Sequence, residues 1–270
     1  MKTKEKIFFA KLISFFLSFF FKKKKIRKIN KIKFFIDLNE GIDLYLLIFR
    51  KFEYEIINTA KELIKNKKKN IIDIGANNGV HTLQFANELN FSHVYAIEPT
   101  NYSYDKLKLN IKLNKNLSNR IKIFKYFIKN KSIKLPKFVY SSWKLNNSKF
   151  HHPEHFGVKM STKGTKTYSL DRFIISKNIK NIGLIKIDVD GHELFVLKSG
   201  KYILKKKIPI LMELAPYLYS DFGYNYVDLI KYIKKFNYNF FSLNPIKKIH
   251  DIKDFTSQIK HGSSVNILLK

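Results

Sequence analysis

The stretch Asn70–Gly79, which reads NIIDIGANNG, decides the fold of this chain. Its first half, NIIDI, is a compact apolar run of the kind that forms a buried β-strand, and two glycines four positions apart follow it. The pattern of Val80–Asn90 then predicts a helix. A strand that passes through a glycine turn into a helix is typical of an open α/β sheet, where ligands bind at the carboxyl ends of the strands.

Segments typical of strands and helices alternate on both sides of this stretch. An extended segment, Lys33–Leu38, and a helical one, Gly41–Lys65, come before it. The segments predicted after it are the strands Ser92–Ile97, Arg120–Ile128, Gly183–Val189 and Ile208–Leu214 and the helices Tyr102–Asn114, Leu194–Leu204 and Val227–Phe236. Phe240–Leu243 and Asn266–Leu269 are expected to form a closing strand pair. This alternation predicts a mostly parallel sheet with helices on both faces.

The composition narrows the class of protein. Of the 270 residues, 45% are hydrophobic, which excludes a disordered or collagen-like chain. The chain contains no cysteine, which excludes a disulfide scaffold, a zinc site made of thiolates and a cysteine nucleophile. The least regular stretch, residues 131–166, interrupts the alternation and is a candidate insertion on the substrate side of the site.

The strong positive charge is discounted as a sign of nucleic-acid binding. The formal net charge is +31, from 52 Lys+Arg against 21 Asp+Glu, but only four of these residues are arginines. Arginine is the preferred residue for phosphate recognition. The chain is rich in Lys, Asn, Ile and Phe, the residues that AT-rich codons favour. A compositional bias of the genome therefore explains most of the charge, and a nucleic-acid partner is not expected.

Residues 1–32 form a separate basic and hydrophobic helix ahead of a domain that covers residues 33–270. Residues 7–21 would span roughly 22 Å as a helix, short of a hydrocarbon core of about 30 Å. A narrow polar stripe is expected on this helix, made of Lys4, Lys11, Ser14, Ser18, Lys22 and Lys25. This pattern favours a helix that lies in the interface of an anionic membrane. A signal peptide, a membrane span and a helix packed on the domain are the alternatives.

Two further motifs follow predicted strands. Glu98 ends the second strand, 19 residues after Gly79, and an acid at this distance accepts hydrogen bonds from the ribose of a bound nucleoside. The third motif, KIDVDGHE, places Asp188, Asp190 and His192 at the end of another strand. Carboxylates this close together raise one another's pKa and can serve as acid–base groups. Helix capping by Asp190 is the structural alternative.

Taken together, these motifs resemble the FkbM-type methyltransferase family. The resemblance extends over roughly residues 33–214, and its elements appear in the same order and spacing: DIGANNGVHTLQFA, AIEP, Ser169-Leu170-Asp171, IKIDVDGHELFVLKSG and Met212-Glu213-Leu214. It implies a class I, Rossmann-like fold and an S-adenosylmethionine-dependent methyltransferase. The characterised members methylate hydroxyl groups of sugars and of natural products.

The resemblance also implies roles for individual residues. Those expected around the methionine part of S-adenosylmethionine are Asp73, Gly75, Asn77 and Gly79, and Asn78 and Thr82 are also expected to bind the cofactor. Glu98 would hold the ribose, Asn130 would accept a hydrogen bond from the adenine, and Asp188 would lie beside the sulfonium. Asn130 stands where the family tends to have an aspartate, and Asp190 where it usually has a glutamate.

A general base is expected because a neutral sugar hydroxyl is a poor nucleophile. We nominate His192, oriented by Asp188, Asp190 or Glu213. The alternative is a structural His192 that donates to a neighbouring backbone carbonyl. No metal site is expected, since Pro153 breaks the helix that would align His151 and His155. The aromatic residues of the same insertion, Tyr140, Trp143 and Phe150, either stack on a sugar ring or cover the core.

The sequence thus predicts an O-methyltransferase that acts on a sugar, a glycan or a glycolipid precursor. The alternatives are an RNA methyltransferase and a non-catalytic binding protein associated with a membrane. We expect a cytoplasmic protein that sits peripherally on the cytoplasmic face of the inner membrane through residues 1–32.

Overall fold

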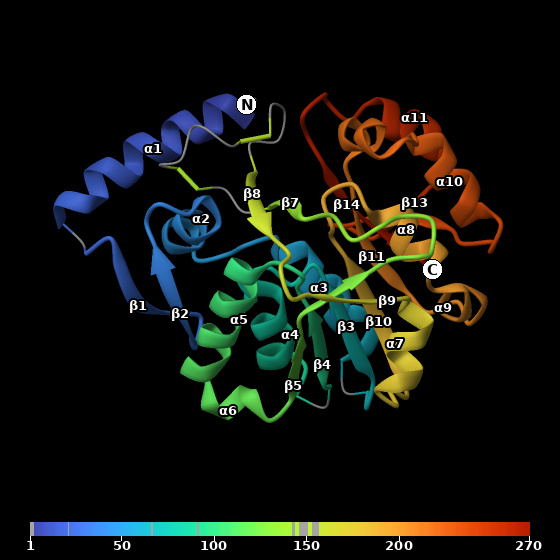
Figure 1. Cartoon of the computed structure of the whole chain (residues 1–270), viewed down its shortest axis with the longest axis horizontal. Helices are drawn as coiled ribbons and strands as arrows, with labels where there is room; N and C mark the ends of the chain where they lie inside the picture. The colour runs from blue at the N-terminus through green and yellow to red at the C-terminus, as the bar shows by residue number, and fades with distance from the viewer. Residues whose placement is uncertain are drawn as a thin grey trace.

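A central sheet of eight strands runs through the computed structural model, which describes residues 3–20, 22–65, 67–90, 92–141, 144–145, 151–152 and 157–270 (Figure 1). The strand order is β13-β12-β14-β11-β10-β3-β4-β5. In that order, the strands cover Lys247–Ile249, Phe240–Ser242, Val265–Leu269, Ile210–Leu214, Ile182–Ile187, Asn70–Ile74, Val94–Ile97 and Ile121–Phe124.

The path of the chain through the sheet locates a crevice between β3 and β10. From β5 to β11 the neighbouring strands are parallel, whereas β14 is antiparallel to both β11 and β12. The chain runs outward from β3 to β4 and β5 and then returns to β10 on the other side of β3. In open α/β sheets, ligands bind at such a reversal, outside the carboxyl ends of the two strands.

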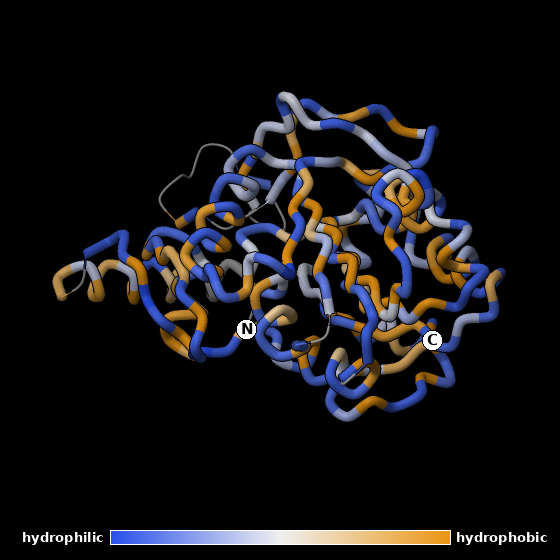
Figure 2. The backbone as a smooth tube through the Cα atoms, turned by 90° about the horizontal axis from the view of Figure 1, so that it is seen from below, coloured by the Kyte–Doolittle hydropathy of each residue, from blue (hydrophilic) through white to orange (hydrophobic). Residues whose placement is uncertain are grey.

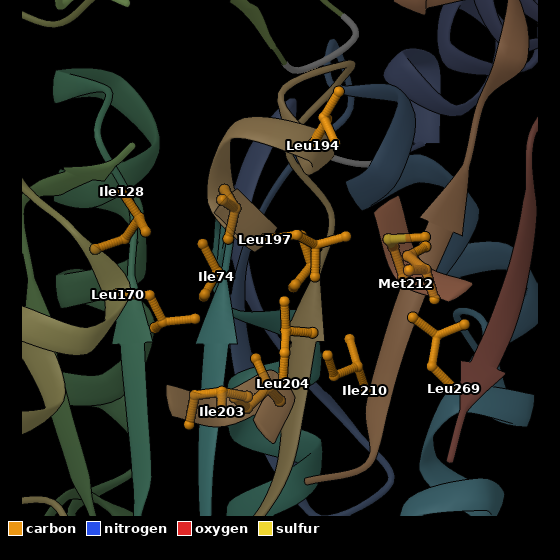
Figure 3. Close-up of a cluster of buried hydrophobic side chains, with 14 of the residues drawn as sticks. Ile74, Ile128, Leu170, Leu194, Leu197, Ile203, Leu204, Ile210, Met212 and Leu269 are labelled. Carbon is orange, nitrogen blue, oxygen red and sulfur yellow. The ribbon is translucent and has the colours of Figure 1, made fainter. Parts of the chain in front are cut away.

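Helices cover both faces of the sheet, and each face has its own hydrophobic core. One core joins Ile71, Leu184 and Leu211 to the first set of helices, α3 (Tyr54–Ile64), α4 (Val80–Glu88) and α5 (Asn101–Leu113). The other joins Ile74 and Met212 to a second set, α7 (Leu170–Ser176), α8 (Glu193–Lys198), α9 (Lys201–Lys205) and α10 (Tyr226–Lys234) (Figure 3). The predicted mostly parallel sheet between two layers of helices is confirmed.

Three of the predicted segments are divided in the structure. The helix predicted for residues 41–65 breaks into α2 (Gly41–Phe49) and α3 at Arg50 and Glu53, which both have a positive φ. The strand predicted for residues 120–128 ends at Phe124, and β6 (Tyr126–Ile128) pairs with β9 (Lys166–Tyr168) outside the main sheet. The helix predicted for residues 194–204 becomes α8 and α9. A pairing that is distant in the sequence, that of β6 with β9, accompanies the second break, and Gly200 separates α8 from α9.

The remaining elements lie around the central sheet. A hairpin of β7 (Phe138–Ser141) and β8 (Val158–Ser161) belongs to the predicted insertion. The short helices are α6 (Lys115–Ser118), the 3₁₀-helix η1 (Pro216–Phe222) and α11 (Ile252–Ser257). The parts of the insertion that contain Trp143, Phe150, Pro153 and His155 lie outside the described residues.

The N-terminal segment is a helix followed by a hairpin. Helix α1 (Thr3–Phe20) lies at one edge of the molecule and contacts α2 (Figure 1). The hairpin of β1 (Lys24–Ile29) and β2 (Ile32–Asp37) follows, and its second strand begins at residue 32. Within the described part of the chain, no helix combines the length and the apolar character needed to cross a membrane.

A buried carboxylate ties this lead-in segment to the glycine turn. Asp43, on α2, accepts hydrogen bonds from the backbone N–H of Asp37, from Nδ2 of Asn78 and from Nζ of Lys106. Both charged side chains of the Asp43–Lys106 pair are almost fully buried. Asn78, which was expected to bind the cofactor, therefore anchors the turn to the lead-in segment.

The Asp43–Lys106 ion pair yields a stability prediction. Lys106→Met leaves the Asp43 carboxylate buried without its cation, and we expect it to lower the free energy of unfolding by about 3–5 kcal/mol. Urea unfolding followed by circular dichroism measures this loss. The double variant Asp43→Asn/Lys106→Met should lose less than the sum of the two single losses, because the two groups interact. Additive losses would contradict the pairing.

Candidate functional site

A cavity of about 420 Å³ lies at the carboxyl ends of β3, β4 and β10. Its size is within the range of small-molecule sites, about 300–1,000 Å³. The strand ends supply the predicted residues that line it, Gly75, Asn77, Glu98, Asp188, Asp190 and His192. The β7–β8 hairpin, His152 and η1 supply further wall residues. The three sequence motifs thus meet at one cavity.

The glycines of the first turn are required by packing within the protein. Gly75 has a φ of +83°, and a Cβ there would lie 1.7 Å from the backbone oxygen of Asp188. Gly79 has a φ of +86°, and its Cβ would lie 2.4 Å from Leu107. Only glycine therefore permits the turn to close against the end of β10 and against α5. The sequence analysis expected both glycines around the cofactor, and Gly75 also lines the cavity.

Glu98 is buried at the cavity wall and holds the glycine turn in place. Its Oε2 accepts a hydrogen bond from the backbone N–H of Asn77 at 3.0 Å. Its Oε1 accepts from the backbone N–H of Thr100 at 2.9 Å and from Oγ1 of Thr100 at 2.6 Å. A carboxylate can accept about four hydrogen bonds, so capacity remains for a ligand hydroxyl. Burial raises the pKa of Glu98, and these hydrogen bonds oppose that rise.

A buried ammonium group lies among the carboxylates of β3 and β10. Nζ of Lys186 is 2.9 Å from Oδ2 of Asp188 and 3.6 Å from Oδ1 of Asp73. Burial opposes the charged form, but the two carboxylates outweigh it and raise the pKa of Lys186. Asp73 is fully buried and accepts a hydrogen bond from Oγ1 of Thr82. Asp73 and Thr82 are therefore buried behind the cavity wall, whereas Asp188 is part of that wall.

His192 lines the cavity and also makes the contact expected of a structural histidine. Its Nδ1 lies 3.2 Å from the backbone oxygen of Val189, to which it can donate. The imidazole contacts the ring of Phe222, with 4.1 Å between the ring centroids, and that of Phe127 at 5.3 Å. Burial lowers the pKa of His192 to about 4, so the ring is neutral at pH 7. With Nδ1 as the donor, Nε2 is the nitrogen that can accept a proton.

The other predicted acids take different positions. Asp190 lines the cavity with a φ of +46°, and burial, reinforced by the charge of Asp188, raises its pKa. It does not cap α8, whose N-terminal cap is His192 without a side-chain bond. Glu213 lies on β11, outside the cavity lining, and accepts a hydrogen bond from Ser264. Asn130 is also absent from the lining, and its Oδ1 accepts from the backbone and side chain of Ser132.

Glu193 forms hydrogen bonds that hold the loop carrying Asp190 and His192. Its side chain is fully buried, and Oε1 accepts from the backbone N–H groups of Val189 and Gly191 at 3.3 Å. Burial raises the pKa of Glu193 to about 7. The glutamate thus fixes the loop from inside the fold and does not line the cavity.

Sequence reasoning missed a histidine–aspartate pair in the cavity wall. Nε2 of His152, in the insertion, lies 2.9 Å from Oδ2 of Asp221, on η1, and both residues line the cavity. The two are 69 positions apart, and no local pattern links them. In the described part of the chain, no three His, Cys, Asp or Glu side chains are grouped to hold a metal ion.

The comparison with protein families decides the identity of this domain. The model of the "Methyltransferase FkbM domain" matches residues 73–240. The chain belongs to the FkbM methyltransferase family. The resemblance read from the motifs is therefore confirmed, and S-adenosylmethionine is the cofactor of this methyltransferase.

Solved methyltransferase structures resemble this FkbM domain at low sequence identity. A precorrin-6y C5,15-methyltransferase from Geobacter metallireducens GS-15 is 9% identical, with a TM-score of 0.45, over 82% of this chain and 88% of that one. TYW2 of M. jannaschii, solved in complex with AdoMet, is 14% identical, with a TM-score of 0.42, over 92% of this chain and 85% of that one. No curated protein matches the chain in sequence. Membership of the family rests on the domain match.

The residues around the cavity fit S-adenosylmethionine. Glu98 offers a buried carboxylate to a ribose, and the apolar side chains of Ile97, Pro99 and Ile128 line the wall beside it. The carboxylate of Asp188 on the cavity wall suits a cationic sulfonium. The cavity lining therefore combines apolar side chains, which suit a base, with acidic groups, which suit the ribose and the sulfonium.

Loss of the Glu98 carboxylate should weaken cofactor binding. We expect Glu98→Ala to reduce the affinity for S-adenosylmethionine at least about tenfold, because hydrogen bonds to a charged acceptor contribute about 1.5–3 kcal/mol. Isothermal titration calorimetry measures the change. Glu62→Ala removes an exposed acid of α3 and should leave the affinity unchanged. Equal affinities of wild type and Glu98→Ala would contradict the assignment.

The buried Glu193 predicts a pH-dependent stability. Its pKa is about 7 in the folded chain against 4.5 for a free side chain, so between these values only the unfolded chain releases the proton. The free energy of unfolding of the wild type should therefore fall by about 3 kcal/mol relative to Glu193→Gln as the pH rises through this window. Urea unfolding at pH 4 to pH 8 measures this difference. A difference that does not change with pH would refute the prediction.

Proposed function

We propose that this methyltransferase transfers the methyl group to a hydroxyl of a sugar, a glycan or a glycolipid precursor. The observation that carries the proposal is that the cavity lined by Glu98 and the glycine turn is also lined by two imidazoles, those of His192 and His152. Hydroxyl methylation needs a proton acceptor beside the cofactor, and a neutral imidazole meets that need.

The reaction divides between the cofactor and the chain. S-adenosylmethionine supplies a methyl group that the positive sulfonium already activates. The side chains of the cavity bind the acceptor, align its oxygen and take its proton. Alignment alone accounts for several kcal/mol of the barrier, and a general base contributes roughly 10²–10⁴-fold.

His192 is the first candidate for the base. Its Nδ1 is held by the backbone oxygen of Val189, which fixes the ring and leaves Nε2 as the basic nitrogen. Phe127 and Phe222 pack around the ring and limit its access to water. The low pKa of His192 keeps it neutral but also makes it a weak base, so its effect depends on its position relative to the hydroxyl.

The His152–Asp221 pair is the second candidate. A carboxylate that orients an imidazole is the arrangement that general bases use in many hydrolases. Tyr140 contacts the ring of His152, with 4.9 Å between the centroids, and lines the same cavity. Aromatic rings of this kind also suit the apolar face of a sugar. The pair comes from the insertion and from η1, which supports an acceptor-side role.

The charge of the cavity favours a neutral acceptor. Among the described residues that line it, Glu98, Asp188, Asp190 and Asp221 carry carboxylates and none is a lysine or an arginine. A nucleic acid would bring its phosphates toward these carboxylates, which repel it. A hydroxyl of a sugar meets no such repulsion. We place the reaction in the cytoplasm.

The test is an acceptor screen. The purified chain is incubated with S-adenosylmethionine and with monosaccharides, nucleotide sugars, glycolipid precursors and transfer RNA, and S-adenosylhomocysteine is measured. We expect turnover only with hydroxyl acceptors that carry a sugar, and mass spectrometry should locate the methyl group on oxygen. Turnover with RNA and not with any sugar would overturn the proposal.

Substitution of each histidine should separate the two candidate bases. Loss of the base lowers kcat by roughly 10²–10⁴-fold and leaves the affinity for S-adenosylmethionine within about twofold. We expect this for His192→Asn, whereas His152→Asn should mainly raise the KM for the acceptor. Steady-state kinetics with calorimetry measures both. The reverse result would assign the base to the His152–Asp221 pair, and an unchanged kcat in both variants would exclude imidazole catalysis.

A further inference from the structure

Helix α1 presents an unusually large apolar surface to solvent. Phe20 is 80% exposed and Phe19 is 68% exposed, and the full set of exposed large apolar side chains on this helix is Phe8, Phe9, Leu12, Ile13, Phe15, Phe16, Phe19 and Phe20. Soluble monomers rarely expose contiguous apolar patches of this size, and those that do use them for binding. Figure 2 shows α1 at the periphery of the molecule, with hydrophobic colouring along it.

Helix α1 contacts the domain through the side of the helix that carries Ser14. Oγ of Ser14 is buried and donates a hydrogen bond to the backbone oxygen of Leu38 at 2.7 Å. Ala10 and Leu17 pack on the core on the same side of the helix. Ser14, one member of the expected polar stripe, therefore faces the protein. The contact with the domain fixes the rotation of α1 and leaves its broad phenylalanine face pointing outward.

The neighbouring elements extend this surface and add positive charge. Helix α2, which contacts α1, exposes Tyr45, Ile48 and Phe49. The segment after α1 carries a cluster of exposed lysines, Lys22, Lys23, Lys24, Lys25 and Lys28. We call α1, the exposed side of α2 and these lysines the α1–α2 surface.

We propose that the α1–α2 surface docks on an anionic lipid bilayer, with α1 lying flat in the interface. The apolar side chains supply the insertion, and the lysines supply attraction to negative headgroups at about 1 kcal/mol each. The 18 residues of α1 form a helix of roughly 27 Å, and no described helix meets the criteria for a span. A second copy of the chain would bring the same lysines face to face, so the charge favours lipid as the occupant.

The docking surface is joined to the wall of the cavity. The segment that accepts the hydrogen bond of Ser14 continues into Asn39 and Glu40. The backbone oxygen of Asn39 accepts a hydrogen bond from the N–H of Leu145 at 2.7 Å, and Glu40 forms an isolated β-bridge with Lys144. Residues 144–145 belong to the same insertion as Tyr140 and His152, which line the cavity. These contacts connect the segment that holds α1 to the insertion that supplies part of the cavity wall. The proposal does not depend on which hydroxyl is methylated.

Vesicle flotation with the full chain tests the proposal. The probes are phosphatidylcholine vesicles with and without phosphatidylglycerol, at low and at high salt. We expect flotation with the phosphatidylglycerol vesicles, at least about tenfold weaker with pure phosphatidylcholine and reduced by salt. No flotation of folded protein with the anionic vesicles would overturn the proposal.

Two variants probe the two parts of the surface, and a third serves as the control. Phe15→Asp/Phe19→Asp and Lys22→Gln/Lys23→Gln/Lys25→Gln should each lower the partition coefficient at least about tenfold. Ile175→Asp changes an apolar side chain that is 77% exposed on α7, at the far side from α1, and should leave flotation unchanged (Figure 1).

Controls on folding and on oligomeric state complete the test. All three variants replace exposed residues, so their urea unfolding curves should match that of the wild type. Light scattering after size exclusion should show a monomer with and without the Phe15 and Phe19 substitutions. A wild-type dimer that these substitutions dissociate would show that a second copy covers the surface and would refute docking on lipid.

Discussion

The ammonium group of Lys186 holds together the acidic edge of the sheet on which the site is built. It is buried between Asp73 at the end of β3 and Asp188 just beyond β10, the two strands that flank the crevice. The same two strand ends meet where Gly75 lies against the backbone of Asp188, a contact that has no room for a Cβ. Burial raises the pKa of Asp73, and the ammonium group of Lys186 beside it opposes that rise. Asp188, which is one-third exposed, lies at the cavity beside the same ammonium group.

Local sequence patterns predicted the sheet because its strands are compact apolar runs bounded by turns. They failed at the points where a predicted element is broken. Phe124 and Tyr126 belong to one apolar run, yet the chain leaves the main sheet between them to pair with β9. Glu53 takes a positive φ that no residue pattern indicates, and it starts α3 there. Position in the fold overrides propensity at these points.

The location of the site could be predicted from the sequence, whereas the roles of its individual residues could be predicted only in part. Motifs at strand ends meet at one edge of a parallel sheet, which is why Glu98, Asp188 and His192 lie around one cavity. The side chains of Asp73 and Asn78 face inward instead, where they bind Thr82 and Asp43. Sequence spacing locates a residue at a strand end, but it does not say whether a ligand or the protein takes up its hydrogen bonds. The pairing of His152 with Asp221 depends on tertiary structure alone.

The positive charge of the chain and the chemistry of its site are separate properties. The cavity is lined by carboxylates, whereas lysines are exposed in the segment after α1. The net charge of +31 therefore does not describe the wall of the cavity, which contains no lysine or arginine among the described residues. A genomic bias accounts for an abundance of lysine and phenylalanine in the composition, but it does not account for a row of phenylalanines left exposed on one helix fixed by a buried serine. Exposed phenylalanines on α1 and exposed lysines directly after it are the two features that support the proposed docking on a bilayer.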